Sequence, residues 1–347
     1  MRIFLHNFIR NMSLFRRPFR LLFIPFILAL VYLAGPNPAT PVYDTTLPQL
    51  PAAPDLLEQY VAAREAGHQL RPNNQARIIW ANDSSKTPTE YALVYLHGFS
   101  ASQEEGSPLH TNLAKKFGCN LYLSRLAEHG IDTTEQLVNL TADAYWNSAR
   151  DAYAIGRQLG KKVILIGTST GGSNALHLAA TYPDVHALLL LSPNIEINNT
   201  NAWLANNPWG LQIGRMVTGS RYVTPRDNRD IYKQYWNHPY RLEAVVTVQE
   251  YLETAMVSAN FKKITQPALL LYYYRNEQEQ DDVVKVSAML RMFDQLGTPA
   301  GKKRQLPMPN TGDHVIGSYI KSNDYQGVEA EVTKFMIDIL GIPLLQP

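Results

Sequence analysis

The sequence predicts an α/β fold in which a mostly parallel sheet is flanked by helices. Apolar runs alternate along the chain with helical patterns, ending in a helix at about 327–340. Several of these runs contain continuous apolar stretches, such as VILI within 162–166 and ALLLL within 186–191, which is typical of strands that helices cover on both faces. Because active sites in such sheets lie at the carboxyl ends of the strands, the residues that follow each strand are the candidate site.

Each element rests on its own pattern. Apolar runs predict strands at 91–96 (YALVYL), 119–123 (CNLYL), 162–166 (KVILI), 186–191 (HALLLL) and 268–274 (ALLLYYY), with shorter strands at 77–80 and 303–306. Helical patterns predict helices at 55–66, near 104–117, between 133 and 160, and at 172–181, 284–296 and 327–340. No internal repeat and no second linker divides residues 55–347, which we therefore expect to form one domain.

Composition and charge narrow the class of protein. The 347 residues are 45% hydrophobic and 10% aromatic, which excludes a disordered chain. The net charge of +2 includes five arginines within residues 1–35, where there is no acid, so the rest of the chain carries −3. An acidic body argues against a nucleic-acid-binding protein. The single cysteine, Cys119, excludes an internal disulfide and a thiolate zinc cage.

Residues 1–35 are predicted to be a signal anchor or a signal peptide. An apolar run at 21–34 follows an arginine-rich flank made of Arg2, Arg10, Arg16, Arg17 and Arg20. The run has 14 residues, fewer than the roughly 20 that cross a bilayer, and no small-x-small cleavage triplet ends it. An uncleaved membrane anchor is favoured over a removed signal, and a buried core helix is the third interpretation.

The location of the body follows from this segment. By the positive-inside rule, an anchored chain places its body outside the cytoplasm, and a cleaved signal would release it as a secreted or periplasmic protein. Residues 36–54 contain six prolines and few charges, which predicts an extended Pro-rich linker that holds the body off the membrane.

A candidate nucleophile follows the strand at 162–166. Residues 167–171 read Gly-Thr-Ser-Thr-Gly and lead into a helix, so the G-x-S-x-G pattern stands in its strand–turn–helix context. The serine of this pattern sits on a sharp, strained turn, where a side chain at either glycine would collide with a neighbouring element. A phosphate-binding turn is the other interpretation, but G-x-x-x-x-G-K is absent. The pattern therefore indicates Ser169 as a nucleophile.

Two backbone groups are candidates for an oxyanion hole. Acyl transfer needs two NH donors, one from the residue after the nucleophile and one from the loop after an early strand. Thr170 follows the nucleophile, and Phe99 stands in His-Gly-Phe-Ser directly after the strand at 91–96. We therefore expect the NH groups of Phe99 and Thr170 to bind the oxyanion.

The candidate base is His314, which lies in a polar loop between the last strand and the final helix. Its rivals fit less well. His97 belongs to the oxyanion loop, His129 precedes the serine, and His177 lies inside the helix that follows the serine.

The candidate acid follows the strand at 268–274. Asp281 is preferred there, Asp282 is the alternative, and Glu277 and Glu279 are more remote. One of the two aspartates is also placed to cap the helix that starts near residue 283.

With these residues in place, the sequence resembles the α/β-hydrolase superfamily, within the group of serine esterases, lipases, lysophospholipases and monoacylglycerol lipases. The chain order Ser169, Asp281, His314 matches the order of that family, and the resemblance covers roughly residues 75–342. The chain departs from it at 275–280, where the loop is longer and lacks the glycine that often precedes the acid. The resemblance implies an acyl-enzyme mechanism without metal or organic cofactor.

An insertion at about 194–260 separates two of the predicted strands. In the family this position holds a helical cap over the nucleophile, and here it is rich in aromatic residues: Trp203, Trp209, Tyr222, Tyr232, Tyr235, Trp236, Tyr240 and Tyr251. We expect most of them to pack the cap onto the sheet and the rest to favour an apolar acyl or lysolipid-like substrate.

The sequence therefore predicts a serine hydrolase of carboxylic esters. The first alternative is a peptidase or acyltransferase with the same triad, and the second is a non-catalytic binding protein of the same fold.

Overall fold

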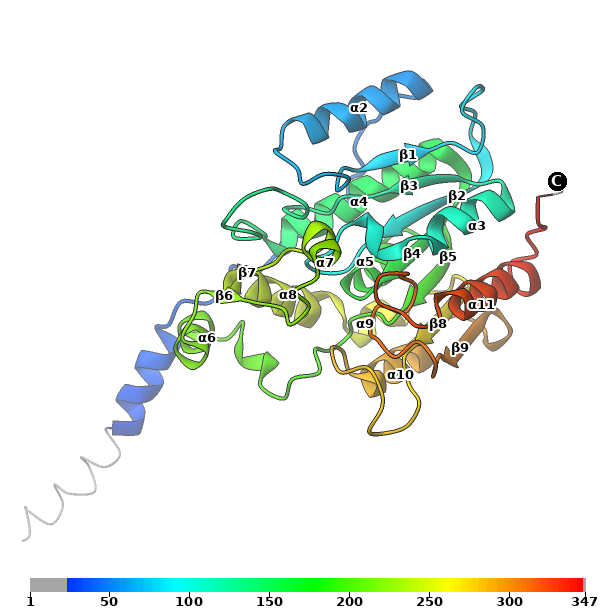
Figure 1. Ribbon diagram of the computed structural model, residues 1–347. Coiled ribbons are helices and arrows are strands. Elements are labelled where there is room, and N and C mark those ends of the chain that lie inside the picture. Colours follow the sequence, from blue (N-terminus) through cyan, green and yellow to red (C-terminus); the bar gives the residue numbers. More distant parts are fainter. Residues whose placement is uncertain (1–23, 346–347) are drawn as a thin grey trace, which may run out of the picture.

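A seven-stranded sheet forms the centre of the computed structural model, which describes residues 24–345 (Figure 1). The strand order is β1-β3-β2-β4-β5-β8-β9. The strands are β1 (Arg77–Ile79), β2 (Thr89–Leu96), β3 (Asn120–Leu123), β4 (Gly160–Thr168), β5 (Val185–Leu191), β8 (Ala268–Tyr272) and β9 (Lys303–Pro307). Every neighbouring pair is parallel except the edge strand β1, which runs antiparallel to β3. The predicted mostly parallel sheet is therefore confirmed.

Helices cover both faces of the sheet and bury two hydrophobic cores. They are α2 (Pro54–Ala66), α3 (Leu109–Phe117), α4 (Ala142–Leu159), α5 (Thr170–Thr181), α10 (Val286–Gln295) and α11 (Tyr325–Asp338). Along β2, Val94 and Leu96 belong to the core shared with α4, α5 and α10, whereas Leu93 and Tyr95 belong to the core shared with α3 and α11. Because successive side chains point to opposite faces, the strand has to be apolar at every position.

Two predicted helices are shorter in the structure. The segment near 104–117 divides into a 3₁₀ turn, η1 (Gln103–Gly106), and α3, because Pro108 cannot continue a helix from the preceding residues. The segment between 133 and 160 is helical only as α4. Thr141 starts α4, since its hydroxyl oxygen accepts a hydrogen bond from the NH of Ala144 at 3.2 Å.

The insertion between β5 and β8 forms the cap. It contains η2 (Ala202–Leu204), α6 (Gly210–Thr218), β6 (Tyr222–Val223), α7 (Asp230–Tyr235), β7 (Tyr240–Arg241), α8 (Leu242–Ala255) and α9 (Ser258–Phe261). The helix α8 packs against α4 and α5 (Figure 1). The helix α7 lies close to η1. The β6–β7 pair, which is antiparallel, was not predicted, because two residues are too few to give a strand pattern.

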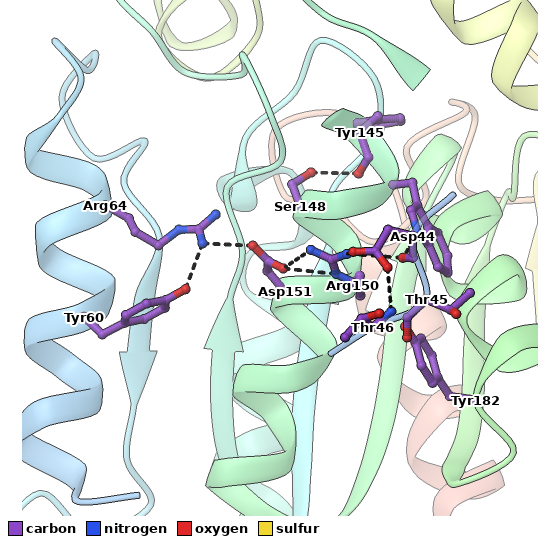
Figure 2. A network of polar contacts seen from close by, with 11 residues as sticks. Asp44, Thr45, Thr46, Tyr60, Arg64, Tyr145, Ser148, Arg150, Asp151 and Tyr182 are labelled. Carbon is purple, nitrogen blue, oxygen red and sulfur yellow. Dashed lines mark hydrogen bonds and ion pairs between the residues drawn. The ribbon is translucent and has the colours of Figure 1, made fainter. Parts of the chain in front are cut away.

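The middle part of the Pro-rich segment, residues 43–50, packs against the α/β domain. Figure 2 shows Asp44 beside α4, where its carboxylate pairs with Arg150 at 2.6 Å, while Asp151 of the same helix pairs with Arg64 of α2 at 2.9 Å. Tyr43 packs against the hydrophobic core and its hydroxyl lies 2.6 Å from that of Thr254 in α8. Residues 43–50 of the predicted linker are therefore attached to the domain, in contrast to a free spacer.

The N-terminal apolar run is described only in part. Residues 24–33 are helical, whereas the arginine-rich flank and residues 21–23 lie outside the described part of the chain. Across residues 24–345, no helix combines the length and the apolar character that a bilayer crossing requires.

Candidate active site

Ser169 lies on a strained turn between β4 and α5. Its backbone angles are φ 54° and ψ −123°, a conformation that costs energy for a residue with a side chain. A Cβ on Gly171 would stand 2.0 Å from the carbonyl oxygen of Leu96, and a Cβ on Gly167 would stand 2.5 Å from the carbonyl oxygen of Gly171. Both glycines are therefore required for the chain to pass this closely, and they leave Ser169 at the carboxyl end of β4.

His314 and Asp281 are paired. The imidazole Nδ1 lies 2.6 Å from the carboxylate Oδ2, and both side chains are buried. The other oxygen of Asp281, Oδ1, accepts hydrogen bonds from the NH groups of Val283 at 2.9 Å and Val284 at 3.0 Å. One aspartate thus both orients the histidine and caps the following turn. Asp282 is exposed and lines the same cavity, but it forms no hydrogen bond or ion pair with His314.

The longer acid loop closes on itself. Tyr274 and Gln280 form an isolated antiparallel bridge, and Arg275 pairs with Glu279 at 2.6 Å across the loop. The NH of Asp281 then donates to the carbonyl oxygen of Tyr273 at 3.2 Å. The extra residues therefore form a closed excursion that returns the chain to the end of β8, and neither Glu277 nor Glu279 approaches the histidine.

The environment of His314 leaves one nitrogen free. Burial is the largest single effect and lowers the pKa of the imidazole, but the carboxylates of Asp281, Asp313 and Glu105 together outweigh it, so the net pKa is raised above its ordinary value. Since Nδ1 is bonded to Asp281, Nε2 is the nitrogen that can accept a proton in the neutral form. Nε2 is buried and has no hydrogen-bond partner among the described residues, and it lines the same cavity as Ser169.

In the turn after β2, the backbone NH groups of Gly98 and Ser100 donate hydrogen bonds, whereas that of Phe99 between them donates to none of the described residues. The NH of Gly98 donates to Glu105 Oε2 at 2.6 Å, and the NH of Ser100 donates to His129 Nε2 at 3.0 Å. Between them, the NH of Phe99 donates to no acceptor within residues 24–345, and the same holds for the NH of Thr170. The two NH groups that the sequence indicates for an oxyanion are thus the ones without a partner.

Two of the rival histidines support this turn. His129 accepts from Ser100 at Nε2, and its Nδ1 lies 2.7 Å from the carbonyl oxygen of Ala127. His97 accepts from the NH of Leu126 at Nε2 at 3.0 Å. Burial lowers the pKa of His97 to about 4 and that of His129 well below its ordinary value, so both are neutral acceptors. Their role is structural, and no sequence pattern indicates it.

The third rival, His177, is remote from the cavity. Its Nδ1 lies 3.2 Å from the hydroxyl of Tyr251, inside the core under the cap. Burial lowers the pKa of His177 to about 4.

A cavity of about 570 Å³ joins the sheet to the cap. Ser169, Thr170, Phe99 and His314 line its floor. The cap contributes Tyr232, Trp236, Tyr240, Val245 and Val248. The other cap aromatics do not line it. Tyr235 and Tyr251 are buried, whereas Trp203 is 53% exposed. The volume is in the range of small-molecule sites. The lining combines apolar side chains with charged ones, namely Arg226, Asp227, Asp282, Asp313 and Lys321.

Glu105 is one of the cavity residues that sequence reasoning did not indicate. It is buried, with a relative exposure of 2%, although nothing in its local sequence distinguishes it from Glu104.

The fold is shared with solved structures of lipolytic enzymes and esterases. A structure from work on LipS and LipT, two metagenome-derived lipolytic enzymes, is 16% identical with a TM-score of 0.62, covering 77% of this chain and 99% of that one. Est1E from Butyrivibrio proteoclasticus is 16% identical with a TM-score of 0.50, covering 77% and 94%. The esterase PF2001 of Pyrococcus furiosus is 15% identical with a TM-score of 0.50, covering 79% and 89%. These likenesses show the fold.

The sequence comparisons identify the family. A search among curated proteins gave no match. Residues 93–318, which include the Ser169 turn, Asp281 and His314, match the model of the alpha/beta hydrolase family. The chain therefore belongs to the alpha/beta hydrolase family.

Proposed function

We propose that this protein is a serine hydrolase that cleaves carboxylic esters through an acyl-enzyme, with Ser169, His314 and Asp281 as its triad. The observation that carries the proposal is the 2.6 Å bond between His314 Nδ1 and Asp281 Oδ2, in a cavity that also contains the strained serine. A neutral imidazole held in this tautomer presents Nε2 as a general base.

The first half of the reaction forms the acyl-enzyme. Ser169 Oγ attacks the ester carbonyl carbon while Nε2 of His314 takes the hydroxyl proton. The oxyanion of the tetrahedral intermediate accepts hydrogen bonds from the NH groups of Phe99 and Thr170, each worth on the order of 10² in rate. The C–O bond to the alcohol then breaks, and His314 returns the proton to the leaving alcohol.

The second half of the reaction releases the acid. Nε2 of His314 removes a proton from water, and the resulting nucleophile attacks the acyl carbonyl. Asp281 stabilises the imidazolium in both halves without being protonated. The bond to Ser169 Oγ then breaks, His314 returns its proton to Oγ, and the carboxylic acid leaves.

The cavity walls favour an apolar acyl portion. Phe99, Tyr232, Trp236 and Tyr240 surround the space next to the serine, and aliphatic side chains extend it through Ile197, Val245, Val248, Val283 and Val315. Burying an apolar chain against such walls contributes about 0.8 kcal/mol per methylene. Esters with medium acyl chains should therefore be cleaved with a higher kcat/KM than acetate esters.

A substrate panel tests the proposal and its alternatives. Purified protein is assayed with p-nitrophenyl esters of two to sixteen carbons, a lysophospholipid, monoacylglycerols, a peptide amide, and an ester with an added alcohol acceptor. Hydrolysis of the esters that is lost in Ser169→Ala supports the proposal. Amide cleavage or acyl transfer in preference to hydrolysis would favour the alternatives, and specific binding without turnover would favour a non-catalytic protein.

We further propose that the N-terminal segment associates the protein with a membrane and that the domain lies outside the cytoplasm. The arginine-rich flank beside the apolar run supports this. Fractionation of cells with protease protection tests it. Full-length protein in the cytosolic supernatant would contradict attachment, digestion of the domain from the cytoplasmic side would contradict the orientation, and release of a shortened chain would favour signal cleavage.

A further inference from the structure

Glu105 is a buried acid that the triad does not use. It lies in η1 and forms no ion pair with any basic residue in the described part of the chain. Its Oε2 accepts hydrogen bonds from the NH of Gly98 at 2.6 Å and from the hydroxyl of Tyr95 at 3.1 Å. Ionising a buried carboxyl group without a cationic partner is energetically unfavourable, so the neutral acid is the more stable form.

The other oxygen of Glu105 lies on the side of the nucleophile. A Cβ placed on Gly98 would stand 2.8 Å from Glu105 Oε1 and 3.0 Å from Ser169 Cβ, so both side chains flank the same point. Glu105 also lines the cavity together with Ser169 and His314. Oε1 accepts no hydrogen bond from the described residues. Since both donors are on Oε2, the proton of the neutral acid belongs on Oε1.

The groups around Glu105 do not offset its burial. Burial raises its pKa to about 7, although the Gly98 hydrogen bond and the positive form of His314 act in the opposite direction. The other titratable groups that interact with it are Tyr95, Tyr145, Tyr232 and Asp313, none of which is cationic. Arg226 and Lys321 line the same cavity, but Lys321 pairs with Asp227 and Asp313, and neither cation forms an ion pair with Glu105. A proton on Glu105 is therefore exchanged in the range where hydrolases work.

Ionisation would oppose catalysis. Glu105 holds the turn that carries the Phe99 NH, so it positions one donor of the proposed oxyanion hole. A negative charge at this buried position repels the oxyanion that develops on the substrate. It also stabilises the positive form of His314, which cannot act as a base.

We propose that Glu105 is a positioning residue of the oxyanion turn that works as a neutral carboxylic acid, and that loss of its proton reduces turnover. This inference rests on the proposed ester hydrolysis, because it assigns a role in stabilising the oxyanion. The site would then contain two carboxyl groups with different roles. Asp281 works in its ionised form, whereas Glu105, 176 positions earlier in the chain, works in its neutral form.

The variant Glu105→Gln separates the neutral from the charged form. The amide oxygen of glutamine can accept the hydrogen bonds from Gly98 and Tyr95, and its NH₂ group takes the place of Oε1–H without ionising. Glu104→Gln is the matched control, because it removes the same charge from the next residue, which does not line the cavity. Both variants are compared with the wild-type protein from pH 5 to 9.

Two rates are measured, kcat/KM for p-nitrophenyl butyrate and the rate constant for labelling by a fluorophosphonate. We expect both rates to fall about tenfold between pH 7 and pH 8.5 in the wild type and in Glu104→Gln, as expected for a group with a pKa near 7. In Glu105→Gln they should stay within about twofold over that range, and the acidic limb should move to lower pH. The same alkaline fall in Glu105→Gln, or a folded variant that is inactive at every pH, would overturn the inference.

A third readout separates this inference from the proposed function. If the wild type neither cleaves esters nor reacts with the fluorophosphonate, the proposed function fails, and with it the role in turnover. The pH dependence of thermal unfolding then still reports on Glu105, because only a buried neutral acid makes the wild type lose stability relative to Glu105→Gln as the pH rises. An unchanged difference in melting temperature between pH 5 and 8 would refute the neutral acid itself.

Discussion

Replacing Asp281 by asparagine should stabilise the tautomer of His314 that carries its proton on Nε2 and cannot act as a base. In the wild type, Oδ1 of Asp281 accepts from two backbone NH groups and Oδ2 accepts from His314 Nδ1. In Asp281→Asn, the amide oxygen stays with the NH groups of Val283 and Val284, since the NH₂ group cannot accept from them. The NH₂ group then faces Nδ1 and donates to it, which leaves the imidazole proton on Nε2. A protonated Nε2 cannot take the proton of Ser169.

The expected loss is large because the base is removed without any loss of packing. In another serine hydrolase family, the same change of a triad aspartate lowers kcat by about 10⁴. That factor corresponds to about 5.5 kcal/mol of transition-state free energy. Without the negative charge of Asp281, burial dominates the pKa of His314, so the acidic limb of the remaining activity should lie at lower pH than in the wild type.

Asp282→Asn is the matched control. It makes the same chemical change at the next residue, which is exposed and forms no hydrogen bond with His314, so kcat should stay within about threefold of the wild type. Steady-state kinetics with p-nitrophenyl butyrate give kcat for the three proteins, and circular dichroism checks that each is folded. A kcat for Asp281→Asn above a tenth of the wild-type value, or a lower kcat for Asp282→Asn, would refute this account of the acid loop.

Three further predictions follow from the packing. Gly98→Ala should lower kcat by about 10² with the fold retained, because its Cβ would press on Glu105 and Ser169 and displace the oxyanion turn; an unchanged kcat would show that the turn is not needed. Glu105 should lower the free energy of unfolding by about 3 kcal/mol in total as the pH rises from its ordinary pKa of 4.5 to about 7. The reason is that a raised pKa in the folded state gives stability that is present at low pH and lost at high pH. Urea unfolding at pH 4.5 and 8 should show this change in the wild type relative to Glu105→Gln, and parallel curves would argue against it. A chain that starts at residue 55 should melt at a lower temperature than one that starts at residue 36, because the core contacts of residues 43–50 are lost, and equal melting temperatures would contradict that packing.

The sheet and the nucleophile turn could be predicted because their physical requirements are local. A strand that is buried on both faces must be apolar along its buried length, and β2, β5 and β8 satisfy this, as does β4 up to the glycine before Thr168. The Ser169 turn requires small residues at fixed positions on either side of the serine, because the chain passes close to neighbouring backbone. Both requirements leave a direct mark in the sequence.

Other parts of the site depend on contacts between distant segments. Whether Asp281 or Asp282 faces His314 is decided by the closed loop at 274–280 and by the hydrogen bonds to the next two NH groups, which no pattern reveals. His129 and Glu105 reach the oxyanion turn only after the chain has folded. The packing of residues 43–50 was missed because a few apolar residues among prolines resemble a linker.

Reaction with a fluorophosphonate tests the central claim most directly, because only an activated serine is labelled at a useful rate. The purified wild-type protein and Ser169→Ala are treated with the same probe, and tryptic peptides are analysed by mass spectrometry. We predict one adduct, on the peptide that contains Ser169, formed in the wild type and absent from Ser169→Ala, together with a loss of ester hydrolysis of about 10³ or more in the variant. An unlabelled wild-type protein, an adduct on another residue, or a Ser169→Ala variant that still hydrolyses esters at a tenth of the wild-type rate would contradict the account.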